Sequence, residues 1–322
     1  MVTAAATIIA AAVVIFIIDV ESMILPTRRR IVDAHVHVWG DGSPPHPYIK
    51  LPPPPTELVV EGSPARLLSL MDASSVDYAV VIQPIQYLYD HRYLTDEVMI
   101  VPEYNRRLKF MALMDPTLED TAYGECFLEG LYRRGFVGVR FNPALFPNNE
   151  GMSDDKGVAW FRKCGELKMV VGIMCFKGLS RHYDDVVSLL TKGSESTNVI
   201  IDHFGFFLQD GAVDETSFTQ LLSLARFPNV HVKISGLFRV STQPFPHKDL
   251  DIRLMQLVDA FGSQRLLFGT DFPFVMQQQS NKPYHAYVHD AISSWERTAT
   301  TMTPTQLDDL FFCTAERLFG PF

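Results

Sequence analysis

The chain has 322 residues, of which 47% are hydrophobic, 11% aromatic and 20% charged, and this composition is typical of folded globular proteins. Its formal net charge is -9 at pH 7 and its basic residues are scattered, which argues against nucleic acid as a partner. The four cysteines are too far apart for a CxxC metal knuckle or a small disulfide framework, so we expect a reducing compartment.

The first 30 residues form an apolar extension that differs from the rest of the chain. Residues 1–18 contain no charged side chain, and they are just long enough to cross a hydrocarbon core of roughly 30 Å. Arginines at positions 28–30 would hold the following domain in the cytosol if this segment is a signal anchor. Met23 offers a second interpretation, because a chain that starts there lacks the apolar segment and would be cytoplasmic.

From residue 31 onward, short apolar runs alternate with amphipathic stretches. The runs start 25 to 47 residues apart, which is the length of a parallel strand plus a crossover helix and its loops. Signals for the start of a helix occur between runs at Ser63-Pro64 and Asp214-Glu215, and after the last run at Thr303-Pro304. The eight predicted strands lie within residues 31–39, 78–83, 110–116, 135–142, 169–178, 199–205, 231–236 and 266–273.

The fold class follows from the composition of these runs. They are apolar throughout rather than strictly alternating, which indicates strands that are buried on both faces of a parallel sheet. Eight strand–helix units suit a closed (β/α)8 TIM barrel, with residues 31–322 as a single domain. An open doubly wound sheet is the alternative, but no run is followed by a GxGxxG turn. The proline-rich residues 42–55 are predicted to form a long first loop over the barrel mouth.

Several chemically active side chains stand at the ends of the predicted strands, where the active site of a barrel forms. His35 and His37 are two residues apart and therefore point to one side of the first strand. His203 ends the sixth run, and Asp271 lies in a Gly-Thr-Asp turn after the eighth. These four are the ligand types of an open catalytic Zn²⁺ or Mn²⁺ site. Asp271 could also take a proton from a bound water, so we predict Asp271 and His203 to be catalytic.

The other strand ends supply cations and small polar groups. Arginine binds carboxylates through paired hydrogen bonds and lysine acts as a compact charge, so three cations at one mouth predict a small anionic substrate. For any one of these cations, a structural ion pair under the barrel loops is an equally good interpretation. The predicted substrate contacts are Arg140, Lys177, Ser235 and Arg239 at strand ends, Tyr48 in the first loop and His247 after the seventh strand.

Several segments resemble the amidohydrolase-related family, and within it the lactonase-like branch that includes 2-pyrone-4,6-dicarboxylate hydrolase and sugar lactonases. The segments are VDAHVHVW, VIQPI, GVRFNP, MCFKGL, IIDHFGF, FPNVHVKISGLFR and RLLFGTDFPF, in this order from residue 31 to about residue 319. The chain also resembles plastid and algal amidohydrolase-like proteins that carry an N-terminal targeting extension. This likeness adds import into a plastid-type organelle as a third interpretation of residues 1–30.

The resemblance implies a distorted barrel with metal ligands at His35, His37, His203 and Asp271. It also implies that Asp271 is the hydrolytic base and that Arg140 contacts the substrate. Family members that hold a metal firmly usually have a further histidine or a modified lysine at strand four or five. In this chain those strands end in Arg140 and in Cys175 and Lys177, and the sequence does not define the state of Lys177. Some lactonase relatives look metal-independent, so a mechanism without metal stays open.

The function predicted from these residues is a hydrolase that opens a lactone or a similar cyclic ester or amide of a small carboxylated molecule. In this reaction Asp271 activates water, and the histidines, directly or through a metal, stabilise the developing oxyanion. Two alternatives remain at this point. One is a metal-dependent decarboxylase of a carboxylated ring, and the other is a noncatalytic barrel that is tethered to a membrane.

Overall fold

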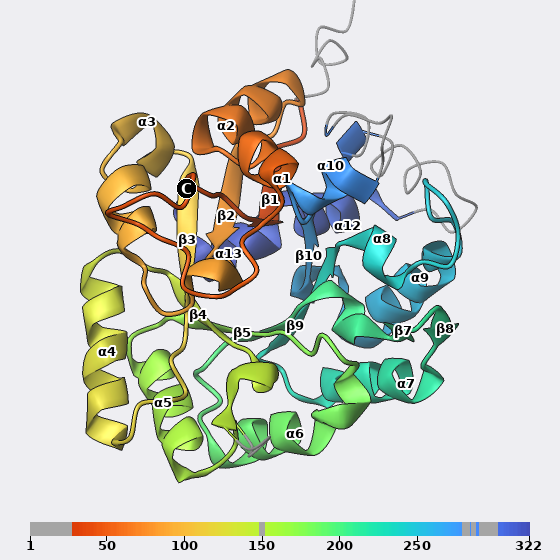
Figure 1. The fold of residues 1–322 in the computed structure, drawn as a ribbon. Coiled ribbons are helices and arrows are strands. Elements are labelled where there is room, and N and C mark those ends of the chain that lie inside the picture. The colour runs from red at the N-terminus through yellow and green to blue at the C-terminus, as the bar shows by residue number, and fades with distance from the viewer. Residues whose placement is uncertain (1–27, 148–151, 279–283, 285–287, 290–301) are drawn as a thin grey trace, which may run out of the picture.

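The computed structural model describes residues 28–147, 152–278, 284, 288–289 and 302–322. Eight parallel strands form one sheet in the order β1-β2-β3-β4-β5-β6-β9-β10 (Figure 1). The sheet closes where the N–H of His37 donates to the carbonyl of Phe272 at 2.7 Å. The predicted (β/α)8 barrel is thereby confirmed. Its strands are β1 (Val32–Val36), β2 (Tyr78–Ile82), β3 (Leu108–Leu113), β4 (Gly138–Phe141), β5 (Val170–Ile173), β6 (Val199–Ile201), β9 (Val230–Ser235) and β10 (Leu266–Gly269).

Helices connect the strands and surround the barrel (Figure 1). Ser63, Asp214 and Thr303 each accept a hydrogen bond from the backbone N–H three residues later, so the three predicted helix starts are true N-caps. The helices are α1 (Thr56–Glu61), α2 (Pro64–Ala73), α3 (Pro102–Asn105), α4 (Thr121–Arg133), α5 (Asp155–Glu166), α6 (Tyr183–Lys192), α7 (Glu215–Ser223), α8 (Leu237–Val240), α9 (Leu250–Phe261), α10 (Phe274–Gln278), α12 (Pro304–Asp308) and α13 (Thr314–Phe319). A small antiparallel hairpin, β7 (Leu208–Gln209) with β8 (Ala212–Val213), projects between β6 and α7.

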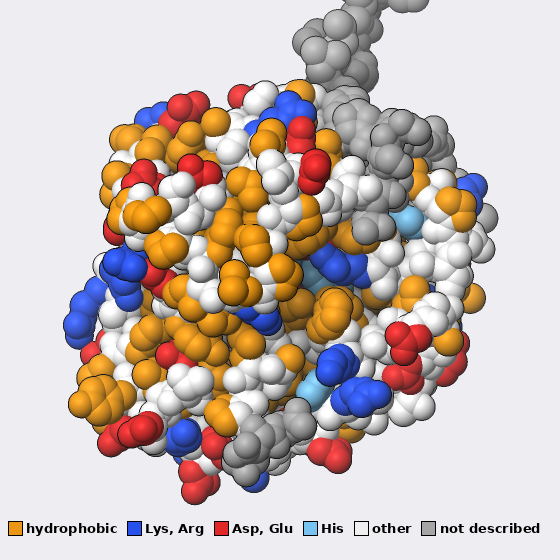
Figure 2. All heavy atoms as spheres, in the orientation of Figure 1, with side chains coloured by type: hydrophobic (Ala, Val, Ile, Leu, Met, Phe, Trp, Pro, Cys, Tyr) orange, Lys and Arg blue, Asp and Glu red, His pale blue; other side chains and the backbone are white. Residues whose placement is uncertain are grey.

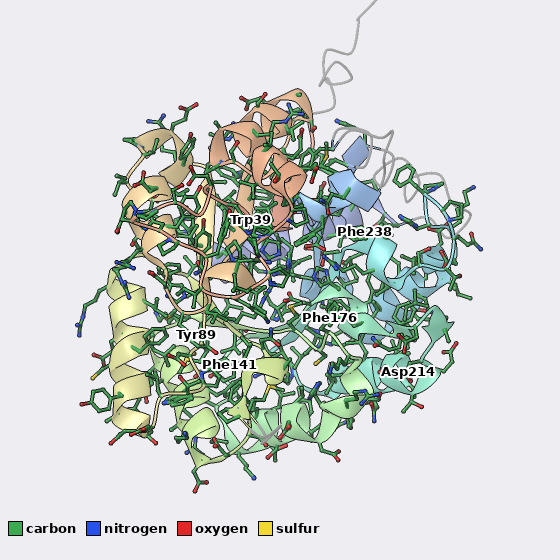
Figure 3. All side chains as sticks on the ribbon, in the orientation of Figure 1. Trp39, Tyr89, Phe141, Phe176, Asp214 and Phe238 are labelled. Atoms are coloured by element: carbon green, nitrogen blue, oxygen red, sulfur yellow. The ribbon has the colours of Figure 1, made fainter. Side chains whose placement is uncertain are left out.

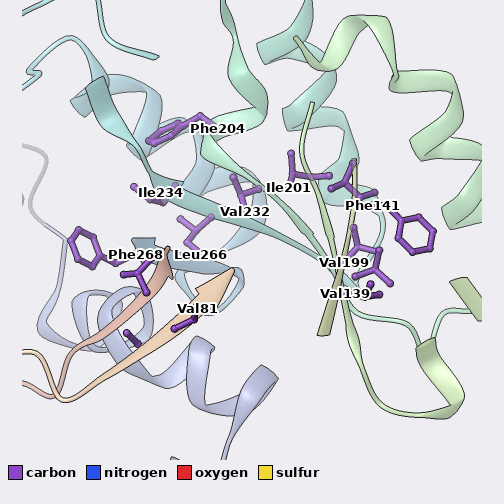
Figure 4. Packing of buried hydrophobic residues seen from close by; sticks show 14 of the residues in the cluster. Val81, Val139, Phe141, Val199, Ile201, Phe204, Val232, Ile234, Leu266 and Phe268 are labelled. Carbon is purple, nitrogen blue, oxygen red and sulfur yellow. The ribbon is translucent and has the colours of Figure 1, made fainter. Parts of the chain in front are cut away.

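The hydrophobic core has two parts because side chains alternate along each strand. Val199, Ile201, Val232 and Ile234 belong to the larger cluster between the strands and the helices (Figure 4). A second cluster fills the inside of the barrel near the strand starts, and residues of the C-terminal segment pack against it. This segment closes one end of the barrel and leaves the other end for a site. The interior cluster consists of Val32, Ala34, Val80, Ile82, Met111, Val170, Ile200, Leu267, Phe312, Ala315 and Phe319.

An irregularity in β1 turns its two histidines toward the open end of the barrel. The register between β1 and β2 shifts between Asp33 and Val36. Ala34 belongs to the interior cluster, whereas His35, the next residue, lines the cavity described below. A local irregularity of this kind changes the direction of the following side chains, and such features often lie next to active sites.

The proline-rich loop at residues 42–55 contacts the same end of the barrel. The N–H groups of Ile49 and Lys50 donate to the carbonyl of Gln86 at 2.8 and 2.9 Å, and the side chain of Gln86 lines the cavity. Among the described residues, no helix is long and apolar enough to cross a membrane. The predicted membrane segment at residues 1–18 lies outside the described residues.

The free energy of unfolding should depend on pH because a histidine is buried in the fold. His231 on β9 is buried, and burial lowers its pKa to about 4. An unfolded histidine has a pKa of about 6.5, so between these values the unfolded chain binds a proton that the folded chain does not. The free energy of unfolding should therefore fall as the pH drops from 6.5 to 4, by about 1.4 kcal/mol per pH unit for each such histidine.

Urea unfolding of the wild type and of His231→Gln at pH 7 and pH 5 measures this effect. The variant should lose less stability than the wild type between the two pH values, because its side chain does not titrate. Equal losses in both proteins would show that His231 is not the cause.

Candidate active site

The C-terminal ends of the strands surround a cavity of about 170 Å³. Figure 2 shows histidine and basic side-chain atoms at the bottom of a hollow in this face, with hydrophobic side chains around it. Trp39 and Phe176 are part of the hydrophobic wall (Figure 3). The charged and histidine side chains that line the cavity are His35, His37, Arg140, His203, Arg239 and Asp271.

His37 and Asp271 face each other with no proton between them. Nδ1 of His37 lies 2.9 Å from the carbonyl oxygen of Ile82, which can only accept, so Nδ1 carries the proton. Burial lowers the pKa of His37, and the neutral ring then presents the lone pair of Nε2 to Oδ1 of Asp271 at 3.5 Å. Two acceptors therefore meet in a buried place, and Oδ1 has no hydrogen-bond donor.

His35 is held in the corresponding tautomer. Nη2 of Arg140 lies 3.0 Å from Nε2 of His35, and because a guanidinium only donates, Nε2 must accept. The proton of His35 is therefore on Nδ1, which lies 3.5 Å from Oδ1 of Asp202. Burial and the nearby Lys233 charge lower the pKa of His35 well below its ordinary value, which keeps the ring neutral.

His203 approaches the other histidines from the end of β6. Its ring centroid lies 4.4 Å from that of His35, and its Nδ1 lies 2.9 Å from the hydroxyl of Ser235. The ring packs closely over Gly236, where a Cβ atom would lie 2.7 Å from Nδ1. Glycine is required there both for this approach and for its own φ of +55°. Burial lowers the pKa of His203 to about 4, so the ring is neutral near pH 7.

Asp271 is fixed by its backbone turn and by an ion pair. Its φ is +65°, a conformation that non-glycine residues rarely adopt and that recurs at active sites. The preceding Thr270 donates its N–H and its hydroxyl to Asp33 at 2.9 and 2.6 Å, which anchors the turn. Oδ2 of Asp271 accepts from Nε of Arg239. Burial would raise the pKa of Asp271, but Arg239 and the histidines hold it far below its ordinary value.

Lys233 and Asp202 form a buried charge cluster beneath the histidines that the analysis of strand ends does not predict. Lys233 on β9 is 1% exposed, and its Nζ lies 3.2 Å from Oδ1 of Asp202 and 3.3 Å from Nδ1 of His35. Nε of Arg140 lies 3.4 Å from Oδ2 of Asp202. Burial would raise the pKa of Asp202, but Lys233, His35 and Arg140 lower it well below its ordinary value.

A signal for Lys233 was present in the sequence. In the run HVKIS, alternation places Lys233 on the same side as Ser235 and opposite Val232 and Ile234. The lysine lies inside the barrel, two residues before the end of its strand, whereas the residues predicted for the site lie at or after the strand ends.

The donor set at the cavity fits a divalent metal ion. Ligand atoms of His35, His37 and Asp271 all lie within 4.8 Å of one another. Nε2 of His37 and Oδ1 of Asp271 face each other without a donor between them, so a cation would satisfy both atoms. Nε2 of His35, which accepts from Arg140, is the third possible ligand atom. His203, which was predicted as a fourth ligand, lines the cavity but is not part of this cluster, and its Nδ1 contacts the hydroxyl of Ser235.

Four predicted substrate contacts do not line the cavity, namely Lys177, Tyr48, His247 and Ser235. Lys177 is exposed and lines a separate surface depression, although the preceding Phe176 still lines the cavity. The hydroxyl of Tyr48 donates to the carbonyl of Gly40. His247 is buried in its own loop, where Nδ1 lies 2.8 Å from the carbonyl of Gln243. Ser235 contacts His203 rather than the cavity, whereas Arg140 and Arg239 line it as predicted.

Comparison with known proteins places the chain in a family. The sequence model of the amidohydrolase family matches residues 32–320, and the chain belongs to this family of enzymes. A 4-sulfomuconolactone hydrolase from Hydrogenophaga intermedia is 28% identical over 254 residues, which cover 75% of this chain and 74% of that protein. An L-fucono-1,5-lactonase from Burkholderia ambifaria is 26% identical over 255 residues, which cover 75% and 80%. The predicted likeness to plastid and algal proteins stays a prediction.

Solved structures share the same fold, and each covers 90% of this chain. A probable 2-pyrone-4,6-dicarboxylic acid hydrolase from Acinetobacter baumannii with bound citric acid has a TM-score of 0.69 at 20% identity, over 99% of its own chain. An amidohydrolase from Burkholderia multivorans with bound zinc has a TM-score of 0.65 at 19% identity, over 99% of its chain. A 2,6-dihydroxybenzoate decarboxylase from Rhizobium has a TM-score of 0.59 at 15% identity, over 98% of its chain.

Removal of one partner from the Lys233–Asp202 pair should be costly. Lys233→Met leaves a buried carboxylate with less compensation, and we expect a loss of on the order of 3 kcal/mol in the free energy of unfolding. The double variant Lys233→Met, Asp202→Asn should lose less than the sum of the two single variants, because it removes both charges. Urea unfolding measures both effects, with the exposed Lys177→Met as the control. If Lys233→Met lowered the free energy of unfolding no more than Lys177→Met does, the Lys233–Asp202 pair would not stabilise the fold.

Proposed function

We propose that the protein hydrolyses the ester bond of a lactone on a small anionic substrate. The observation that carries this proposal is the buried Oδ1 of Asp271, which points into a lined cavity, has no donor and is held ionised by Arg239. A carboxylate oxygen in this state can accept a hydrogen bond from a water molecule and orient it. The lactone hydrolases among the curated relatives support the choice of substrate class.

Asp271 positions the attacking water and takes up its proton. Its low pKa keeps it ionised across the working pH range and also makes it a weak base. Proton transfer therefore becomes favourable only when the water has begun to bond to a polarised carbonyl carbon. This dependence means that Asp271 has to act together with a nearby positive charge.

Arg140 and Arg239 supply that positive charge at the cavity wall. Arg140 contacts His35 through Nη2, Asp202 through Nε and the sulfur of Met174 through Nη1. Arg239 bonds to Asp271 through Nε. The terminal nitrogens of both guanidinium groups carry two N–H bonds each, so each arginine retains further donors. These donors would stabilise the oxyanion that forms on the carbonyl oxygen, or hold a carboxylate of the substrate.

His203 is placed to protonate the leaving oxygen. The hydroxyl of Ser235 both donates and accepts, so it can bond to Nδ1 of His203 in either tautomer. The ring can therefore exchange the nitrogen that carries the proton without losing its orientation. When the ring C–O bond breaks, the proton that Asp271 took from water passes through His203 to the leaving alkoxide. This transfer yields an open-chain hydroxy acid and returns Asp271 and His203 to their starting protonation states.

We further propose that His35, His37 and Asp271 hold a zinc or manganese ion. Two imidazoles and one carboxylate form the ligand set of many catalytic zinc sites. A bound divalent ion would supply Lewis-acid polarisation of nearby oxygen atoms. Arg140 donates to the same lone pair of His35 that such an ion would use, so the guanidinium has to shift from Nε2 when the ion binds.

Asp271→Asn tests the catalytic assignment. The asparagine amide can donate to Nε2 of His37, so the variant should fold, but it cannot accept the proton of water. We expect kcat/KM for a lactone to fall by at least about 100-fold, measured by proton release, while Asp251→Asn on α9 leaves it unchanged. Carbon dioxide release from carboxylated rings should be absent in the wild type, and finding it would favour the decarboxylase alternative.

Metal analysis tests the ligand assignment. The chain, purified without chelator, should carry about one equivalent of zinc or manganese by mass spectrometry. His37→Ala should lose this metal, because it removes one of the three acceptors, and His182→Ala outside the cavity should retain it. Metal content that is the same in both variants would show that the ion binds elsewhere.

A further inference from the structure

A second hollow adjoins the active-site cavity. Its volume is about 330 Å³, and Phe176 and Arg239 line both spaces, so the two share part of their walls. Figure 3 shows Phe176 and Phe238, which both line the second hollow, to the right of Trp39. We call this space the outer hollow, and it is lined by Phe176, Phe206, Leu208, Gln209, Asp210, Phe238 and Arg239.

The boundary between the two spaces is held in place. The guanidinium of Arg239 lies 5.0 Å from the ring of Phe238 and 4.8 Å from the ring of Phe274, while its Nε bonds to Asp271. Gln209 donates to the carbonyl of Phe206 at 2.8 Å and to that of Phe176 at 3.4 Å, which ties the β7–β8 hairpin to this wall. The outer hollow is therefore a formed extension of the active site.

The walls of the outer hollow have an aromatic part and a polar edge. The side chain of Phe176 is 52% exposed, and its ring packs edge-to-face on Phe206 at 5.4 Å. Exposed aromatic rings of this kind favour contact with another flat ring. The carboxylate of Asp210, which also lines this space, is exposed in the hairpin turn and forms no ion pair among the described residues.

We propose that the outer hollow binds a planar ring on the substrate that carries a hydrogen-bond donor, such as a hydroxyl, on its far side. This inference rests on the proposed lactone hydrolysis and names its substrate class as aryl-substituted lactones. The cavity of about 170 Å³ accommodates the lactone ring. A substituent on this ring that extends past Phe176 and Arg239 enters the outer hollow. The phenylalanines contact the faces of the second ring and Asp210 accepts its donor.

The test compares three substrates on the full chain: γ-butyrolactone, its γ-phenyl derivative and its γ-(4-hydroxyphenyl) derivative. We expect kcat/KM to rise by about tenfold from the first to the second, and by a further few-fold to the third. Leu208→Trp fills the outer hollow and should abolish the gain without changing hydrolysis of γ-butyrolactone. Asp210→Asn keeps the backbone turn and should remove only the additional gain from the hydroxyl.

Val213→Trp is the matched control, since Val213 lies on the same hairpin but does not line the outer hollow. It should behave as the wild type with all three substrates, and thermal melting checks that every variant is folded. If γ-butyrolactone is hydrolysed but the aryl derivatives show no gain, or if Leu208→Trp leaves the gain intact, the inference is wrong and the proposed function stands. If no lactone is hydrolysed, the proposed function itself fails.

Discussion

The negative charge of Asp202 in the middle of the barrel is the constraint on which the site depends. A carboxylate that is 1% exposed has to be paired, and Lys233 and Arg140 pair it from two other strands. Arg140 also donates to Nε2 of His35 and Asp202 lies 3.5 Å from its Nδ1, and these two contacts fix the tautomer of the ring. The pairing that Asp202 requires in the interior therefore determines that the lone pair of His35 is on Nε2, at the mouth of the barrel.

At the mouth of the barrel, in contrast, hydrogen-bond acceptors face each other without enough donors between them. Oδ1 of Asp271 meets the Nε2 atoms of His37 and His35 at 3.5 and 3.8 Å without a donor. The oxygens of Asp202 beneath also lack a close hydrogen bond, but Lys233 and Arg140 lie 3.2 and 3.4 Å from them and balance their charge. A buried polar atom without a partner destabilises the fold, and such atoms concentrate at sites that bind an ion, a water or a substrate. The surrounding network keeps this oxygen charged and in place until a ligand arrives.

Much of this arrangement could be predicted from the sequence, because its main signals are local. Apolar runs and helix caps indicated eight strand–helix units, and the C-terminal strand ends pointed to His35, His37, His203 and Asp271. The remaining features depend on contacts between distant strands. Lys233 is recognised only when its alternation within β9 is combined with its distance from Asp202 across the barrel. Lys177 was misplaced because the sequence does not show that Phe176, rather than Lys177, lines the cavity after β5 ends at Ile173.

The most direct test of the central claim is the fate of water oxygen. Incubation of the protein with a γ-lactone in ¹⁸O-labelled water, followed by mass spectrometry of the hydroxy acid, shows whether water attacks the carbonyl. We predict one labelled oxygen in the carboxylate of each product molecule and none in its hydroxyl. A label in the hydroxyl, or no turnover of any lactone, would contradict the assignment of the cavity to hydrolysis by a water that Asp271 orients.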